Sequence, residues 1–584
     1  MKQIAAAGLS PGLMSAGLGT VPAQQTYLDL SQGNRVFNSL YDSDLPDLAG
    51  DCPSWWTSVL QRAESAPADI VPGLLTSSLQ AAALGVQAKG GASCVFSPHP
   101  NSDGFKAISK KLSETPRPHA RAAGFEVRSS TLGRLSSQVR TLHPGDLLIA
   151  AARPTAQTDE LLAIGIAGNG FDGDLTSDST RTDGYVLSTD VAPTILDYFG
   201  IDLPSQMSGQ PIRSEGSVDP AAIESLKGRM EVVSGRRGPV IGLSLLAWIV
   251  VLGLATAISR GGLARPGVRL MGLAVIYMPL LMLLGPAIRP GESAEVLLVM
   301  LGAPLLGAVT LAALRGYRAL AVASALTVLA YAVDVIAGSP LTKLALLGPN
   351  PGLGVRFYGI GNELEALLGV LAVAGTGAGL AGFAPGLSPR RCAGAFLALG
   401  LLCAFVFAAG RFGADVGAAI VFPLGAAMAA AAIAAGGRRS ALLVVAAPFA
   451  VLAALALIDL VSGANSHLTR SVLDAGGLGD LSDVAQRRLQ LSAHSFARPI
   501  LLIFLPLVAA PAALAIWRRD RLRAWLGAAP ALRAGLIGAV AATAIGTLAN
   551  DSGALLLEIG TAYLLVFVGY VWTESRTHSA GPGR

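Results

Sequence analysis

The chain has 584 residues, of which 52% are hydrophobic and only 14% are charged. Soluble globular proteins contain about 25% charged residues, so this composition excludes an ordinary soluble protein and indicates a polytopic membrane protein. The formal charge is +5, but the arginines stand in short pairs between apolar segments, as in cytoplasmic loops, so nucleic-acid binding is not supported.

The apolar residues are concentrated in the second part of the chain. We therefore expect a soluble extracytoplasmic domain over 1–236, a transmembrane domain over 237–575 and a cytoplasmic tail over 576–584. The first residues, MKQIAAAGLSPGLMSAGLG, make a poor signal peptide and a poor span because they lack a continuous apolar core. An external domain must cross the membrane, so we expect that Met1 is not the true start, with inverted topology as the competing explanation.

The four cysteines are of two kinds. Cys392 and Cys403 lie within one apolar segment, and we expect them to pack as small hydrophobic side chains. Cys52 and Cys94 lie in the soluble part, where an external location permits a disulfide. Two separate buried thiols are an equally good interpretation of these two residues.

Helix-like and strand-like segments alternate in the soluble part. Residues 72–89 predict a helix and then a strand, and 132–154 predict an amphipathic helix, a Pro-Gly-Asp turn and a buried strand. A further strand is expected over 160–168 and a short helix over 190–200. This alternation predicts an α/β domain with a largely parallel, doubly wound sheet.

Residues 184–212, GYVLSTDVAPTILDYFGIDLPSQMSGQPI, resemble the closing segment of the alkaline phosphatase superfamily, which includes sulfatases and phosphodiesterases. The shared pattern is D-x-x-P-T-[IL]-L-x-x-x-G-[IV] followed by a proline and M-x-G-x-P, and it is carried here by Asp190, Pro193, Thr194, Ile195, Leu196, Gly200, Ile201, Pro204, Met207, Gly209 and Pro211. The resemblance implies an alkaline phosphatase-like α/β fold.

The chemistry of that family requires a metal cluster held by Asp and His residues and a nucleophile. No apolar strand ending in Asp precedes Gly8, and no D-H or D-x-x-x-H pair occurs between 90 and 190. His99, His119 and His143 have no acidic residue beside them in the sequence and are interpreted as surface histidines, and Asp172, Asp174 and Asp178 as a solvated loop rather than a cation site. We expect a truncated or degenerate domain that lacks its N-terminal strand and has no metal-dependent phosphatase activity; any metal or cofactor stays unknown.

A transmembrane helix needs about 20 mainly apolar residues, and on this basis we expect about eleven spans. They lie near 238–258, 268–288, 294–314, 317–337, 363–383, 392–410, 415–436, 440–461, 499–517, 532–549 and 553–572. Arginines occupy every second connection, for example at Arg260, Arg315 and Arg390, which predicts that these connections face the cytoplasm. The protein is then a multi-pass protein of the bacterial inner membrane, with the soluble domain outside.

The outward connections contain polar residues that are costly near a bilayer. We expect six of them to surround one site at the outer leaflet, with at least one arginine–carboxylate contact: Glu363, Arg411, Asp415, His467, Arg470 and Asp551. Asn362, Glu365 and Asn550 belong to the same motifs, and Glu558 lies inside the last span. Helix capping is the alternative, in which Asn362 caps a helix and Glu363 and Glu365 complement its dipole.

Arginines bind phosphate groups, and carboxylates can serve as acids, bases or ion ligands. The mixed set therefore predicts a membrane lipid partner, with a phosphorylated lipid or lipid-linked glycan as the substrate or ligand. A secondary transporter and a non-catalytic membrane scaffold are the alternatives. Whether the chain is an enzyme stays open.

Overall fold

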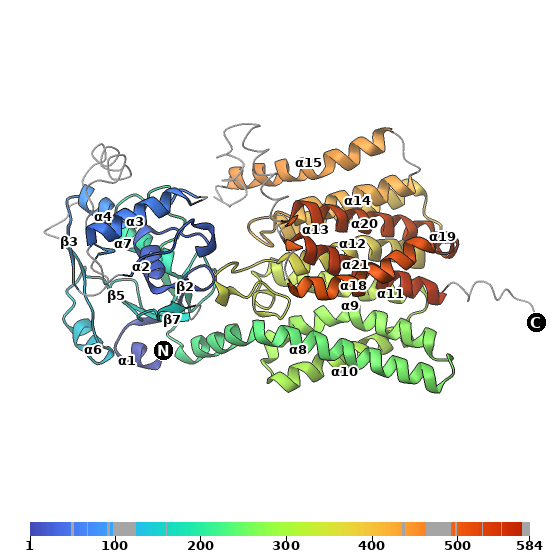
Figure 1. Ribbon diagram of the computed structural model, residues 1–584, viewed down its shortest axis with the longest axis horizontal. Helices are drawn as coiled ribbons and strands as arrows, with labels where there is room; N and C mark the ends of the chain where they lie inside the picture. Colours follow the sequence, from blue (N-terminus) through green and yellow to red (C-terminus); the bar gives the residue numbers. More distant parts are fainter. Residues whose placement is uncertain are drawn as a thin grey trace, which may run out of the picture. The chain divides into compact units, whose positions relative to one another are not determined.

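The computed structural model describes residues 1–47, 52–66, 68–89, 94–96, 124–158, 161–434, 438–462, 492–493, 495–496, 499–527, 529–550 and 552–574. The chain divides into two compact units (Figure 1). Unit 1 comprises Met1–Val232 and Asn350–Phe357, and unit 2 comprises Val233–Pro349 and Tyr358–Arg584. This division falls close to the expected boundary at 236, but it assigns a short segment from the membrane half to unit 1.

The main sheet of unit 1 has four strands, in the order β5 (Leu148–Ala151), β7 (Leu161–Ala167), β1 (Ser10–Ser15) and β9 (Tyr185–Leu187). β7 runs antiparallel to both of its neighbours, and β1 pairs in parallel with β9. The prediction of a largely parallel sheet is therefore wrong for these strands, because the sheet is small and mixed. Residues 152–160, which join β5 to β7, are too few for the crossover that parallel neighbours need.

Among its described residues, unit 1 has three further strand pairs: β2 (Val21–Pro22) with β6 (Gln157–Thr158), β3 (Gly85–Ala88) with β4 (Gly124–Val127), and β8 (Asp174–Ser177) with β10 (Ile212–Glu215). Its helices are α1 (Lys2–Ala6), α2 (Ala23–Gln32), α3 (Cys52–Glu64), α4 (Leu74–Ala81), α6 (Leu132–Arg140) and α7 (Val191–Tyr198), with the 3₁₀ turns Asn38–Leu40 and Ser188–Asp190. The helices and strands predicted over 72–89, 132–154, 160–168 and 190–200 are all present. The strand within 132–154 was predicted to be buried, but β5 lies at the edge of the sheet and none of its four residues is buried.

Strand β1 lies at the centre of the main sheet, and all six of its residues are buried. It packs closely on β8, since a Cβ added at Gly12 would lie 2.9 Å from the Cβ of Leu175. The apolar core around it includes Met14, Ile164 and Val186, all at 0% exposure. The sequence analysis did not predict this strand, although it forms the middle of the domain.

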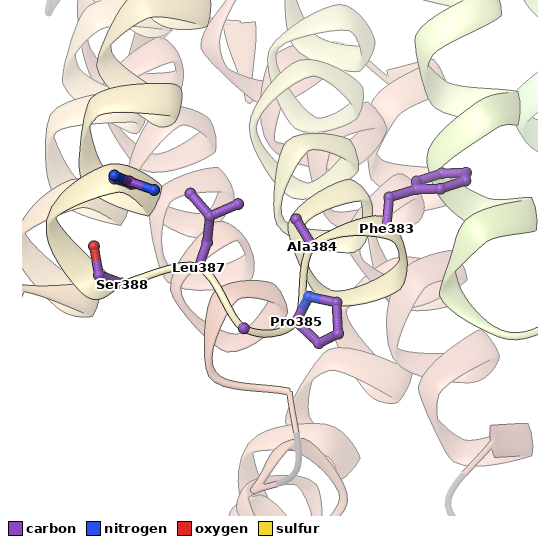
Figure 2. Close-up of a pocket in the computed structure, with 7 residues that line it drawn as sticks. Phe383, Ala384, Pro385, Leu387 and Ser388 are labelled. Atoms are coloured by element: carbon purple, nitrogen blue, oxygen red, sulfur yellow. The ribbon is translucent and has the colours of Figure 1, made fainter.

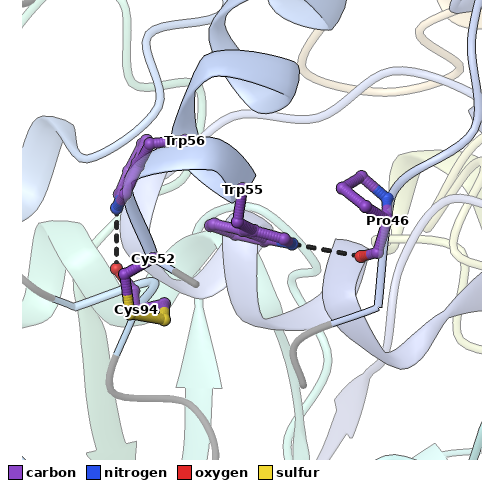
Figure 3. The surroundings of a disulfide bond; sticks show 5 residues. All are labelled: Pro46, Cys52, Trp55, Trp56 and Cys94. Atoms are coloured by element: carbon purple, nitrogen blue, oxygen red, sulfur yellow. Dashed lines mark hydrogen bonds between the residues drawn. A yellow bond between two sulfur atoms is a disulfide. The ribbon is translucent and has the colours of Figure 1, made fainter. Parts of the chain in front are cut away.

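Cys52 and Cys94 form a disulfide, with their Cα atoms 5.3 Å apart. Figure 3 shows the bond at the start of α3, where the indole of Trp56 donates a hydrogen bond of 2.9 Å to the carbonyl of Cys94. The pairing that the sequence left open is thus settled in favour of the bond. Cys392 and Cys403 are both free and buried, as predicted.

Removing the disulfide by a double Cys→Ser substitution at Cys52 and Cys94 is expected to lower the free energy of unfolding of unit 1 by about 2–4 kcal/mol, because the bond closes a long loop in the unfolded chain. Urea-dependent proteolysis of the full chain, scored by cleavage within unit 1, measures the effect. A reducing agent should destabilise the native protein by a similar amount and leave the double variant unaffected. Equal resistance of the native protein with and without reductant would contradict the prediction.

Unit 2 is built from helices, most of them long, that lie side by side (Figure 1). They are α8 (Pro220–Ile258, which begins in unit 1), α9 (Ala264–Ile288), α10 (Glu292–Ala313), α11 (Tyr317–Ile336), α12 (Asn362–Phe383), α13 (Pro389–Ala408), α14 (Ala418–Ile433), α15 (Arg438–Ser462), α18 (Pro499–Trp517), α19 (Arg519–Leu526), α20 (Pro530–Ala549) and α21 (Gly553–Glu574), with a 3₁₀ turn at Thr342–Leu344. At the centre, α12 packs against both α11 and α20.

Eight helices among the described residues are long and apolar enough to cross a membrane: α8, α9, α10, α11, α12, α13, α20 and α21. Shorter apolar helical segments cover Ala418–Ile433, Val444–Leu455 and Val508–Trp517. These three fall within the other spans predicted from the sequence. The chain thus has the features of a multi-pass membrane protein, while the count of eleven spans stays a prediction.

Candidate functional site at the start of helix α12

Helix α12 begins at Asn362, and its N-cap is the backbone of Gly361, with no side chain capping it. The capping role considered for Asn362 is therefore wrong. Its side-chain oxygen instead accepts a hydrogen bond of 3.2 Å from Nδ2 of Asn550, which lies 188 positions away at the end of α20. Two of the polar motifs recognised in the sequence thus meet in space.

Glu365, in the first turn of α12, is completely buried. Its Oε2 accepts a hydrogen bond of 2.8 Å from the same Nδ2 of Asn550. Gly417, the N-cap of α14, lies so close that an added Cβ would be 2.7 Å from the carboxylate carbon of Glu365. Glycine at 417 therefore leaves the space that the buried carboxylate occupies, and three helices converge on this group.

Glu363 forms an ion pair of 2.8 Å with Arg237 of α8. The other arms of this guanidinium donate to backbone carbonyls, from Nε to Leu346 at 2.5 Å and from Nη2 to Gly348 at 2.9 Å. Both charged side chains are about a quarter exposed, at 30% for Arg237 and 23% for Glu363. The arginine thus links α8, the connection after α11 and the start of α12.

We refer to these five residues as the α12 polar cluster: Arg237, Asn362, Glu363, Glu365 and Asn550. A second ion pair of the same type lies in unit 2, where Nη1 of Arg236 is 3.2 Å from Glu295 in the first turn of α10. Consecutive arginines of α8 therefore pair with acidic residues at the starts of two different helices. Each pair places a cation beside a carboxylate that also favours the positive end of a helix dipole.

The structure describes three of the six predicted site residues, which are Glu363, Arg411 and Asp415. Glu363 belongs to the cluster. Asp415 is buried and lies between α13 and α14, in a connection that contacts the residues before α12 through a hydrogen bond of 3.1 Å from Ile360 N–H to Gly413 C=O. Arg411, in the same connection, is exposed, and its guanidinium lies 5.9 Å from the ring centre of Phe412.

The other three predicted residues, His467, Arg470 and Asp551, lie outside the described residues. The single cavity expected around all six therefore stays a prediction. Arg237 is the cluster residue that the sequence analysis missed. A signal was present, since it stands directly before an apolar span, where an arginine needs a carboxylate or carbonyl partner.

A shallow surface depression lies where α12 passes into α13, at the other end of α12 from the cluster (Figure 2). It is lined by Phe383, Ala384, Pro385, Gly386, Leu387, Ser388 and Arg391. Nearby, Nε of Arg318 donates a hydrogen bond of 2.8 Å to Gly382. The lining contains no carboxylate, so the depression lacks the mixed charges of the α12 polar cluster.

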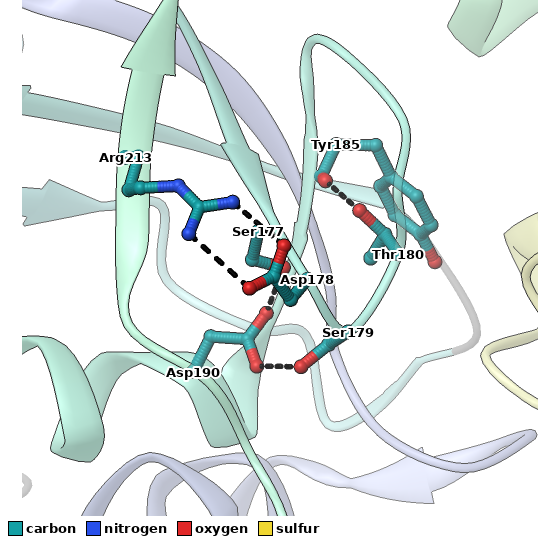
Figure 4. Close-up of polar contacts among 7 residues, drawn as sticks. All are labelled: Ser177, Asp178, Ser179, Thr180, Tyr185, Asp190 and Arg213. Carbon is teal, nitrogen blue, oxygen red and sulfur yellow. Dashed lines mark hydrogen bonds and ion pairs between the residues drawn. The ribbon is translucent and has the colours of Figure 1, made fainter. Parts of the chain in front are cut away.

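In unit 1, the aspartate that opens the alkaline phosphatase-like pattern is completely buried, and Figure 4 shows its contacts with Ser177 and Ser179. The carboxylate of Asp190 accepts hydrogen bonds of 2.6 Å from Ser177 and 2.6 Å from Ser179, and 2.9 Å bonds from the backbone N–H groups of Leu187 and Gln210. Burial raises the pKa of Asp190, and these donors oppose the shift. The carboxylate thus holds several loops together.

The other acidic residues considered for a cation loop are also engaged. Asp178 forms an ion pair of 2.6 Å with Arg213 (Figure 4), which holds the pKa of Asp178 below its usual value. Asp174 is buried and accepts a hydrogen bond of 2.9 Å from the backbone of Asp219. The interpretation of these residues as a solvated loop is thus wrong for Asp174.

His143 lies 3.4 Å from Asp146, three positions later, and its side chain is exposed, which confirms its interpretation as a surface histidine. Both side chains are largely exposed, at 85% and 50%. Within the part of the chain that the structure describes, no group of three or more His, Cys, Asp or Glu residues could hold a metal ion. His99 and His119 lie outside that part.

No protein-family model matches the chain, and neither the curated proteins nor the solved structures include a match.

Proposed function

We propose that this chain is a multi-pass membrane protein that binds the polar head of a phosphorylated lipid or lipid-linked glycan at the end of the bundle where α12 begins. The α12 polar cluster carries this proposal. It joins α8, α12 and α20 through residues up to 188 positions apart. Polar groups inside a membrane bundle cost free energy, and those that are present often mark functional sites.

The chemistry of the cluster suits a ligand with a polar head. Carboxylates and amides accept and donate hydrogen bonds to sugar hydroxyl groups, and arginines bind phosphate oxygens. The exposed apolar side chains on the outer helices, such as Leu301, Leu305 and Val309 of α10, suit contact with hydrocarbon chains. A lipid with a large polar head would satisfy both surfaces at once.

The distribution of arginines among the connections supports an extracytoplasmic site. Arginines are frequent in the connections at the other end of the helices, for example Arg260, Arg315 and Arg390, and cytoplasmic loops are enriched in such residues. The protein would then lie in the inner membrane of a bacterial cell envelope, with unit 1 outside and the C-terminus in the cytoplasm.

For unit 1 we propose an alkaline phosphatase-like domain that binds a ligand but does not catalyse metal-dependent hydrolysis. Support comes from the pattern around Asp190, where the 3₁₀ turn and α7 follow β9 directly. The aspartate itself is committed to four hydrogen bonds within the fold. A scaffold or receptor role for the domain is consistent with this arrangement.

The proposal predicts that Glu363→Gln and Glu365→Gln each weaken binding of a sugar linked to a long-chain polyprenyl phosphate by about tenfold or more, equivalent to about 1.4 kcal/mol, because a charged carboxylate accepts stronger hydrogen bonds from sugar hydroxyl groups than an amide does. Equilibrium binding to the purified full-length protein in nanodiscs measures the effect. Glu292→Gln is the matched control, because Glu292 also lies in the first turn of a helix but is exposed. Unchanged binding in both cluster variants would contradict the proposal.

A secondary transporter is the second candidate, and it is favoured by one observation. Glu558 lies in α21 at 7% exposure, and its Oε1 is buried with no hydrogen-bond partner among the described residues. Carboxylates buried within membrane helices commonly belong to ion or proton pathways. Ion-dependent flux into proteoliposomes that Glu558→Gln abolishes, without polyprenyl phosphate binding, would favour the transporter.

A further inference from the structure

Residues Asn350–Phe357 lie in the connection between α11 and α12, yet they belong to unit 1. We call this segment the strap. It contains a 3₁₀ turn at Pro351–Leu353, followed by Gly354 in the left-handed conformation with φ of 70°. The turn directs three of its carbonyl groups, those of residues 351, 353 and 354, to three different donors of unit 1.

The three donors differ in chemical type. The hydroxyl of Tyr185 donates a hydrogen bond of 2.7 Å to the carbonyl of Pro351. The backbone N–H of Gly19 donates at 3.0 Å to Leu353, and Nη2 of Arg35 donates at 2.8 Å to Gly354. A phenol, a backbone amide and a guanidinium that converge on one short turn form a donor set of the kind that binds oxyanions.

The donors lie at the carboxyl end of β1. Nη1 of Arg35 also donates to Ser15, the last residue of the strand, at 3.3 Å, and to the carbonyl of Gly17 at 3.0 Å. A Cβ added at Gly354 would lie 2.6 Å from Oγ of Ser15, so the strap is in close contact with the strand end.

The charge of Arg35 is not neutralised by direct contact. The acceptors given above are all neutral, and among the described residues no carboxylate lies within 4.0 Å of its guanidinium. Phe357 of the strap provides an aromatic ring 5.6 Å from the guanidinium carbon. The guanidinium of Arg35 therefore donates to a neutral carbonyl group of the strap. An anion in the same place would form stronger, charge-assisted hydrogen bonds with it.

We infer that Gly19, Arg35 and Tyr185 form an oxyanion site for a phosphate group, and that the strap occupies this site as an internal ligand. A ligand with a phosphate group displaces the strap by replacing its carbonyl oxygens with charged ones. The strap leads into α12, which begins at Asn362, so its displacement changes the chain segment directly before the α12 polar cluster. The site itself does not depend on the function proposed for that cluster.

Hydrogen exchange of the full-length protein in nanodiscs tests the inference. The amides of Leu353 and Gly354 are bonded within the strap turn, so exchange of a peptide covering 350–357 reports its release. Phosphate, at up to about 10 mM to cover millimolar affinity, is expected to raise this exchange by about tenfold. In a parallel arm, nanodiscs with phosphatidic acid are compared with nanodiscs of phosphatidylcholine alone.

The two arms separate the sources of the phosphate group. A response to inorganic phosphate supports a soluble phosphate ester, and a response to phosphatidic acid alone supports a lipid head group. Arg35→Met and Tyr185→Phe remove hydrogen bonds to the strap, so they should raise its exchange without ligand and leave no further response to phosphate. The peptide of β7, Leu161–Ala167, should stay protected as a sign that unit 1 is folded. If neither arm changes the exchange of the strap, the inference is overturned and the strap is a permanent part of the unit 1 fold.

Gly354→Ala provides a test without ligand. It is expected to raise exchange of the strap by about tenfold or more, because an added Cβ meets Ser15 and the carbonyl of Gly17. Gly338→Ala is the matched control, since Gly338 lies in the same connection with φ of 95° but has no atom within 4 Å of an added Cβ. Equal exchange in the two variants would show that these contacts do not hold the strap, which overturns its role as a bound internal ligand.

Discussion

Replacing Gly535 with valine is expected to prevent stable folding of unit 2. Gly535 of α20 faces Gly377 of α12, and an added Cβ at 535 would lie 3.1 Å from the Cα of Gly377 and 3.0 Å from the carbonyl of Val373. Both contacts are with backbone atoms, which cannot move aside as a side chain can. Small residues permit this close approach between membrane helices, and valine would force the two helices apart.

The free energy of unfolding is expected to fall by about 3 kcal/mol or more, which is at or above the upper end of the cost of inserting extra atoms into a packed core. Thermal unfolding of the detergent-solubilised protein, followed by loss of helical signal, measures it. Gly394→Val on α13 is the matched control, because Gly394 is exposed and an added Cβ there has no atom within 4 Å. A similar melting temperature for the two variants would show that α12 and α20 do not meet at these glycines.

The local elements of unit 1 follow from the sequence where apolar periodicity is strong. Strand β7, Leu161–Ala167, has six buried residues and one intermediate residue, and its continuous apolar pattern predicts it. Strand β1 has the sequence SPGLMS, in which Pro11 and Gly12 argue against a central strand. Gly12 is nevertheless required there, because Leu175 of β8 occupies the space of a Cβ. Tertiary packing, which a local pattern does not contain, decides this strand.

The direction of the strands could not be predicted from periodicity alone. Alternation of helices and strands favours parallel pairing, but β7 pairs antiparallel with both β1 and β5. The register joins Ser10–Ser15 to residues about 150 positions later in the chain, and no local feature specifies that pairing. The length of the 152–160 connection was the one available sign that β5 and β7 are antiparallel.

The candidate site was partly visible in the sequence because polar residues are rare in apolar helices. For this reason the sequence analysis recognised four residues that belong to the α12 polar cluster: Asn362, Glu363, Glu365 and Asn550. Arg237 was not singled out, because it stands at the first position of the expected transmembrane domain, just before the first predicted span. Its partner Glu363 lies 126 positions away, a distance over which sequence spacing gives no pairing information.

A second large effect is expected from pH, through Asp29 in α2 of unit 1. This residue is 1% exposed, and burial raises its pKa from the usual 3.8 to about 7, against the opposing effects of Gln25, Arg35, Arg62 and Gln32. Gln25 and Gln32 donate to the same carboxylate oxygen, at 2.7 and 3.3 Å. Arginine side chains stay protonated in proteins, so the proton on Asp29 is what changes with pH.

The direction of the pH dependence of stability follows from whether the folded or the unfolded chain holds the proton. Between pH 3.8 and about 7 the folded protein keeps the proton on Asp29, whereas the unfolded chain has lost it. The contribution of Asp29 to stability is therefore fully present below the lower value and is lost as the pH rises to the upper one. At about 1.4 kcal/mol per pH unit, unit 1 should be about 3 kcal/mol less stable near pH 8 than near pH 5 from this group alone.

Asp29→Asn should remove this part of the pH dependence, because the amide stays neutral while its oxygen can still accept from Gln25. Proteolysis of the full-length protein across urea concentrations, scored by cleavage within unit 1 at both pH values, measures the difference. Asp202→Asn is the matched control, since Asp202 is exposed. Asp174 and Asp190 also have raised pKa values and contribute with the same sign, so the comparison must be made between variants and not from the native protein alone. If Asp29→Asn and Asp202→Asn show the same pH dependence, the carboxyl group of Asp29 does not retain its proton in the folded protein.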